Sequence, residues 1–134
     1  MQRKSERVRE ATSKGRADDL RKLVALGADV SANRHGDTLM HLAALHGHRE
    51  VLKALQEFGV DVRSRDHEGR TALHEAACNG HSETVSLLVE MGADVGARVN
   101  DGDTALHVAA NNRQTETVKL LVELGADVRA LDNG

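Results

Sequence analysis

Apolar residues recur every three or four positions in three short stretches of this chain, and mostly polar residues stand between them. This spacing places the apolar side chains on one face of a helix. Each stretch therefore predicts an amphipathic helix that buries a single stripe. The stripes consist of Val51, Leu52, Leu55 and Phe58, of Val85, Leu88 and Met91, and of Val118, Leu121 and Leu124.

A shorter run rich in alanine and leucine precedes each amphipathic stretch and predicts a second helix. The motif Gly-Asp-Thr-Leu-Met-His-Leu-Ala-Ala at residues 36–44 recurs with few changes at 69–77 and 102–110. Each motif threonine stands where a side-chain oxygen can cap the first helical N–H groups. We expect Gly47 and Gly80 to end two of these helices, because glycine adopts a left-handed backbone without a Cβ penalty. The capping threonines are Thr38, Thr71 and Thr104.

The chain repeats with a period of 33 residues, which is the spacing of the motif histidines. After the amphipathic helix, Gly-Ala-Asp-Val, or Gly-Val-Asp-Val at Gly59, breaks the helix and leads into a polar loop. No single unit has enough apolar surface to fold alone, so we expect the units to stack. The motif histidines are His41, His74 and His107, and the aspartates expected to hydrogen-bond within their loops are Asp29, Asp61, Asp94 and Asp127.

With this period and its Thr-x-x-His motif, the sequence resembles the ankyrin-repeat family. The resemblance implies an all-α fold, an α-solenoid of stacked helix-turn-helix repeats with short β-hairpin loops. It covers nearly the whole chain, so we expect a single array over residues 1–134. The expected parts are an N-terminal capping repeat at 1–32, repeats at 33–65, 66–98 and 99–131, and the start of a truncated next repeat at 132–134.

The two ends of the array and one turn depart from a uniform repeat. The first helix is rich in Arg, Lys and Glu, with Val8 and Ala11 as its apolar contacts, and suits a polar cap. The other end begins a hairpin without such a cap, which predicts a fragment of a longer protein and a face for end-to-end pairing. Arg113 replaces the turn glycine of earlier units, and we expect strain there because left-handed turns disfavour other residues.

Composition narrows the classes of function. Phe58 is the only aromatic residue besides histidine, so the core must be aliphatic. Residues 1–22 hold eight Lys/Arg and four Asp/Glu, against ten and seventeen in the remainder, and this acidic body disfavours nucleic-acid binding. No run of 18 apolar residues suits a membrane span. Cys78 is the only cysteine, which favours an intracellular location in the cytoplasm or the nucleus.

The polar residues indicate neither a metal site nor a catalytic site. His46 and His48 form the densest group of histidines, but tight transition-metal sites need three or four converging ligands. In ankyrin-like units the motif histidine makes structural hydrogen bonds near the helix start. His48 and His81 open the second helix of their units, which favours a capping or packing role. No catalytic motif occurs, so we expect neither enzyme activity nor a cofactor.

The resemblance implies a non-catalytic protein–protein interaction module, a scaffold or adaptor that grips another protein. In this family the hairpin tips and the exposed side of the first helices hold the partner, and we call the matching positions the concave strip. The strip comprises His35, Asp37, Leu45, His46, Arg65, His67, Glu68, Arg70, Cys78, Asn79, Arg98, Asn100, Asp101, Asp103, Asn111 and Asn112. Because it lacks Trp and Tyr, Arg65, Arg70 and Leu45 are its expected anchors.

Two other functions are consistent with the sequence. The segment could be a structural spacer in a longer scaffold protein whose partners bind other repeats, and the lack of aromatic residues supports this alternative. It could also be a metal or redox module built on His46, His48 and Cys78. In the favoured interpretation the chain is a monomer with a protein partner, and it binds neither nucleic acid nor a membrane.

Overall fold

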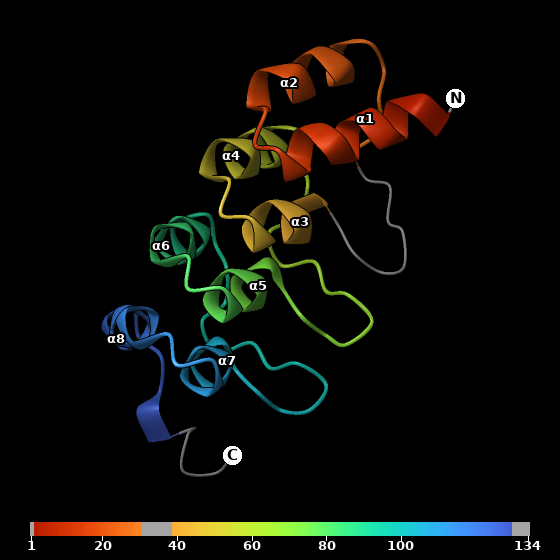
Figure 1. The fold of residues 1–134 in the computed structure, drawn as a ribbon. Helices are drawn as coiled ribbons and strands as arrows, with labels where there is room; N and C mark the ends of the chain where they lie inside the picture. The colour runs from red at the N-terminus through yellow and green to blue at the C-terminus, as the bar shows by residue number, and fades with distance from the viewer. Residues whose placement is uncertain (1, 31–38, 130–134) are drawn as a thin grey trace.

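The chain forms four pairs of antiparallel helices, stacked one on the next, in a computed structural model that describes residues 2–30 and 39–129 (Figure 1). In each pair a glycine or arginine turn joins a first helix to a second. The pairs are α1 (Gln2–Ser13) with α2 (Ala17–Ala25), α3 (Leu39–Leu45) with α4 (Arg49–Glu57), α5 (Ala72–Cys78) with α6 (Ser82–Glu90), and α7 (Ala105–Asn111) with α8 (Thr115–Glu123).

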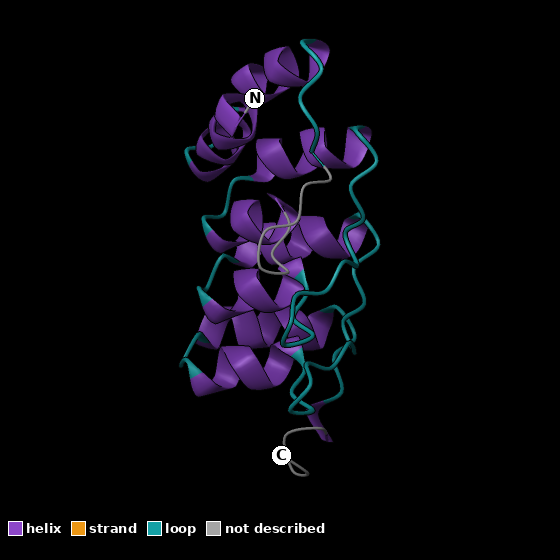
Figure 2. Ribbon diagram, turned by 90° about the vertical axis from the view of Figure 1, so that its right-hand side faces the viewer, coloured by secondary structure: helices purple, strands orange, loops and turns teal. Residues whose placement is uncertain are grey.

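The helices lie in two layers. The first helices α1, α3, α5 and α7 form the inner layer, and the second helices α2, α4, α6 and α8 form the outer layer (Figures 1 and 2). Each helix packs mainly on its partner and on the equivalent helix of the neighbouring pair. The loops that follow α4 and α6 extend from one side of the inner layer and lie beside each other there (Figure 2). This arrangement confirms the predicted all-helical solenoid.

The core is aliphatic and is shared between neighbouring pairs. At one register of the outer helices, Leu55, Leu88 and Leu121 are all completely buried. The inner helices contribute small side chains at their contacts, which lets adjacent backbones approach closely. The small side chains at these contacts include the fully buried alanines Ala43, Ala76 and Ala109. Two polar residues that the apolar pattern does not mark, Thr84 and Thr117, are buried at the outer-helix position of Val51.

The predicted helix boundaries of the inner layer are present where the structure describes them. Thr71 and Thr104 are extended, with φ of −103° and −94°, and α5 and α7 begin at the next residue. Gly47 and Gly80 follow α3 and α5 with φ of 70° and 69°, in the left-handed region that stops a helix. Thr38 lies outside the described residues.

The loops reverse the chain without forming β-hairpins: within 2–30 and 39–129 no residue lies in a strand (Figure 2). One tip is closed by a backbone hydrogen bond of 3.0 Å from the Asp66 amide to the Arg70 carbonyl. The Asn100 amide, in the next loop, donates to the Glu68 carbonyl at 2.8 Å. The tip of the next loop is closed within itself in the same way, by a bond of 2.8 Å from the Val99 amide to the Asp103 carbonyl, so the bond from Asn100 is additional and joins the two loops. Asp61, Asp94 and Asp127 accept hydrogen bonds from the amide two residues later.

Both ends of the described stack expose apolar as well as charged side chains, and Leu26 after α2 is 68% exposed. Val8 and Ala11 of α1 are buried, 1% and 5% exposed, and the charged residues Glu6, Arg7 and Glu10 of the same helix are in water. At the α8 end, Val122 is 40% exposed and Val128 is 52% exposed. End-to-end pairing through this apolar face stays a prediction. No helix among the described residues is long and apolar enough to cross a membrane.

Arg113 adopts the strained conformation expected from the sequence, with φ of 58°, and its side chain is exposed. Replacing it with glycine removes a left-handed penalty of about 1–2 kcal/mol and adds chain entropy to the unfolded state. We expect Arg113→Gly to raise the free energy of unfolding by about 0.5–1 kcal/mol in urea titrations. Arg113→Lys keeps the strain and the charge, so an equal gain in that control would show that backbone strain is not the cause.

Candidate functional site

The motif histidines make hydrogen bonds to the start of their own helix or to the next loop, and His74 makes both. The Thr71 amide donates to His74 Nδ1 at 3.1 Å, so the ring proton is on Nε2, which donates to the Ala97 carbonyl at 3.0 Å. Thr71 Oγ1 lies 2.9 Å from the same Nδ1. Thr104 and His107 repeat this geometry, at 3.0 Å from the amide and 2.8 Å from the hydroxyl. Burial lowers the pKa of His74, which keeps this imidazole neutral.

His41 reaches the next loop in the same way, with its Nε2 2.6 Å from the Arg70 carbonyl. The three motif histidines are all buried, 1% to 6% exposed. They therefore hold the inner layer to the loops and are withdrawn from the surface. The motif residues define the frame on which the exposed side chains are displayed.

A second series of contacts joins the start of each outer helix to the preceding unit. His48 Nε2 lies 2.8 Å from the Ser13 carbonyl, and His81 Nε2 lies 2.9 Å from the Leu45 carbonyl. Gln114 Nε2 donates to the Cys78 carbonyl at 3.2 Å. Each of these carbonyls is the last of an inner helix, where intrahelical partners are missing. Neither histidine caps its own helix with its side chain; each satisfies the end of the preceding inner helix.

The concave strip divides into exposed and half-buried positions, and His35 and Asp37 lie outside the described residues. Three of its residues are half-buried: Arg70, Cys78 and Asp103. The exposed residues are Leu45, His46, Arg65, His67, Glu68, Asn79, Arg98, Asn100, Asp101, Asn111 and Asn112. All the described strip residues are therefore at least partly open to water.

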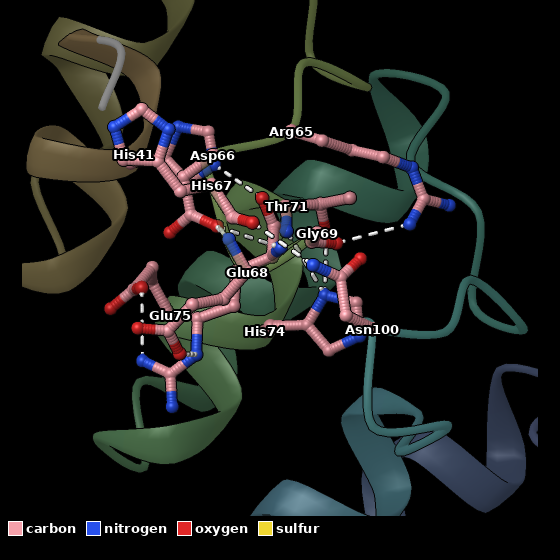
Figure 3. Close-up of polar contacts among 11 residues, drawn as sticks. His41, Arg65, Asp66, His67, Glu68, Gly69, Thr71, His74, Glu75 and Asn100 are labelled. Carbon is pink, nitrogen blue, oxygen red and sulfur yellow. Dashed lines mark hydrogen bonds and ion pairs between the residues drawn. The ribbon is translucent and has the colours of Figure 1, made fainter. Parts of the chain in front are cut away.

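Several strip residues bond within the array (Figure 3). Arg65 Nη1 donates to the Gly69 carbonyl at 3.0 Å and to the Arg98 carbonyl of the next loop at 2.6 Å. Asn100 Nδ2 donates to the His67 carbonyl at 2.9 Å. These side chains brace adjacent loops, so an Arg65 substitution would disturb the loops as well as the surface. Arg98, Asn79 and Asn112 likewise donate to carbonyls within their own loop or helix.

Arg70 lies between two carboxylates. Its Nη1 is 3.4 Å from Glu75 Oε1 and its Nε is 3.7 Å from Glu68 Oε2 (Figure 3). Burial acts to lower the pKa of Arg70, but the two carboxylates outweigh it and raise that pKa. Burial also raises the pKa of Glu75, and Arg70 only partly opposes this effect. Glu75 is the deeper group, with 14% of its side chain exposed, so its ionised form is the less well compensated.

The sequence analysis did not include Glu75 in the concave strip, because Glu75 stands inside the repeated motif and not beside it. The residue after the motif histidine is Leu42, Glu75 or Val108, whereas the following residues are Ala-Ala in every copy. We call Leu42, Glu75 and Val108 the post-histidine row. A change of chemical class at one position of otherwise matching copies was the available signal.

The alternative metal or redox module receives no support from the geometry. The rings of His46 and His48 are stacked with centroids 5.7 Å apart, but His48 Nε2 faces the Ser13 carbonyl. In the part of the chain that the structure describes, no three His, Cys, Asp or Glu side chains are grouped so as to hold a metal ion. Cys78 is half-buried and, as the only cysteine, has no disulfide partner in the chain.

Comparison with known families agrees with this architecture. A family model described as ankyrin repeats in three copies matches residues 9–99 and 59–132, which together span almost the whole chain. Ankyrin repeats are generally protein–protein interaction modules and are typically non-catalytic. The stacked helix pairs, the buried Thr-x-x-His motifs and this match show that the chain belongs to the ankyrin-repeat family.

Proposed function

We propose that this array is a scaffold or adaptor module that binds another protein on the concave strip. The proposal rests on the separation, within each repeat, of buried residues that hold the units together from exposed residues that vary. Thr71, His74 and the motif alanines are buried and hold the units together. The strip residues in the loops before each motif, and those that follow its alanines, are exposed or half-buried where the structure describes them, and they differ from unit to unit. A rigid frame with a variable exposed side suits recognition of a partner.

The strip residues without a bracing role are the best candidates for direct contact. Leu45 is 37% exposed at the end of α3, where an apolar side chain in water gains most from being covered. Asn111 holds the equivalent position on α7 and is exposed, and Cys78 lies between them on α5. We propose that a protein partner inside the cell lies across these three inner helices.

The proposal is tested with two matched double variants of the whole chain. Leu45→Glu with Asn111→Glu adds charge to the concave strip. Lys53→Gln with Lys119→Gln changes the net charge by the same two units on the outer layer, where 51% and 68% of those side chains are exposed. Surface exchanges of this kind change stability by about 0.5 kcal/mol or less. We expect proteins captured from a cell extract by the wild-type chain to be retained by the outer-layer variant and lost with the strip variant.

Quantitative mass spectrometry of the captured proteins gives the comparison, and circular dichroism shows that both variants are folded. A spacer segment predicts the opposite result. If no protein is captured above the level of an unrelated bait, or if both variants capture the same proteins equally, the concave strip is not a binding surface of this segment.

A further inference from the structure

We infer that the partner segment on the concave strip presents a lysine or arginine beside an aliphatic residue, and that this cation pairs with Glu75. The inference rests on the proposed function and adds the chemistry of the partner. It concerns the post-histidine row, in which one carboxylate is set among aliphatic side chains.

Glu75 occupies a recessed position in the inner layer. Glu75 lies on α5, between α3 with Leu42 and α7 with Val108 at the same register, and both neighbouring helices pack on α5. Leu42 is half-buried and Val108 is 8% exposed. The carboxylate is thus recessed in an aliphatic row, with 14% of its side chain open to water. A partner that reaches it must also cover apolar surface.

Carboxylates outnumber the cationic side chains around Glu75. Arg70 is shared between Glu75 and Glu68, at 3.4 Å and 3.7 Å. Asp66 adds a third carboxylate nearby, with its Oδ1 accepting hydrogen bonds from the Glu68 and Arg70 amides. The guanidinium of Arg65 donates to the Gly69 carbonyl (Figure 3) and to the Arg98 carbonyl of the next loop. The three carboxylates outnumber the guanidinium groups of Arg65 and Arg70, so a partner cation completes the local charge balance.

The ionised form of Glu75 is disfavoured by its surroundings. Burial raises the pKa of Glu75 more than Arg70 and His41 lower it, so the ionised carboxylate is held in a poorly solvated place with incomplete compensation. A partner cation restores that compensation, and the contact is strengthened as the aliphatic residues exclude water around it. An anionic partner segment is disfavoured, because Arg70 already lies against two carboxylates.

The test uses a phage-displayed library of random peptides selected on the whole chain. We expect peptides enriched on the wild-type chain to carry Lys or Arg next to an aliphatic residue. Glu75→Gln keeps the side-chain shape and should bind these peptides about tenfold more weakly. Glu75→Lys should select peptides with Asp or Glu at the same place. Glu90→Gln, at an exposed glutamate of α6, is the matched control and should bind the original peptides unchanged.

A double-substitution cycle locates the contact. If the peptide base pairs with Glu75, replacing that base with alanine should weaken binding to the wild-type chain but have little further effect on Glu75→Gln. Equal binding to wild type and Glu75→Gln, or enriched peptides without a base, overturns the inference. Peptides that lack a base yet bind poorly to the Leu45→Glu, Asn111→Glu variant leave the proposed function intact. Absence of any peptide that depends on the strip counts against both.

Discussion

Replacing His74 with alanine should lower the free energy of unfolding by about 3 kcal/mol at neutral pH. The ring is 1% exposed and is the partner of the Thr71 amide and the Ala97 carbonyl. Alanine leaves both backbone groups without these bonds, at about 1 kcal/mol or more each, and leaves a cavity between α5 and the next loop. Urea unfolding followed by far-ultraviolet circular dichroism measures the loss.

The same position makes part of the stability depend on pH. Burial lowers the pKa of His74 below its usual value of 6.5, so the unfolded chain takes up the proton first as the solution is acidified. The neutral ring makes its full contribution to the free energy of unfolding above pH 6.5. This contribution is lost as the pH falls through the pKa of His74 in the folded chain. In that window the wild-type chain should lose up to about 1.4 kcal/mol per pH unit through this group. The difference between wild type and His74→Ala should therefore narrow on acidification.

His67→Ala is the matched control, because His67 is an exposed histidine in the loop before α5. Only its backbone carbonyl bonds to Asn100 in the next loop, and alanine preserves that carbonyl. Its free energy of unfolding should stay within about 0.5 kcal/mol of the wild-type value at every pH tested. An equal loss in the two variants would mean that the Thr71 to Ala97 connection contributes little.

Local patterns in the sequence were sufficient to predict the helices and their ends. The stripe at Leu52 and Leu55 is buried, α5 begins directly after Thr71, and Arg113 has the positive φ expected from its place in a glycine turn. These features depend on residues within one or two turns of one another. Thr117 escaped the pattern because threonine counts as polar, although its hydroxyl is 2.8 Å from Ser82 Oγ of the preceding unit.

Contacts between units were harder to predict because they depend on how far each pair is offset from the next. Arg65 was expected to face a partner, but its side chain reaches the Arg98 carbonyl 33 residues away. The described loops form turns without strands, and the Asn100 amide bonds to the Glu68 carbonyl of the preceding loop, a contact that the sequence of one unit does not reveal. The repeated motif shows which residues are equivalent between units. Which of those residues are in contact depends on how far each helix pair is offset from the next.

Gly15→Ala should lower the free energy of unfolding by about 3 kcal/mol, because two costs coincide at this turn. Gly15 has φ of 73°, which costs alanine about 1–2 kcal/mol. An alanine Cβ there would also lie 2.7 Å from His48 Nδ1 and 3.0 Å from His48 Cγ. The ring must move, which breaks its 2.8 Å contact with the Ser13 carbonyl at the end of α1. Urea titration of the single variants measures the total.

Gly59→Ala and His48→Ala separate the two costs. Gly59 has φ of 89° but no atom within 4 Å of an added Cβ, so alanine there should cost only about 1–2 kcal/mol. Removing the ring in Gly15→Ala, His48→Ala relieves the collision, so the double variant should lose less stability than the sum of its single variants. Additive losses would show that the His48 ring moves aside freely. Non-additivity would instead establish that glycine at this turn provides the space in which each unit holds the end of the one before it.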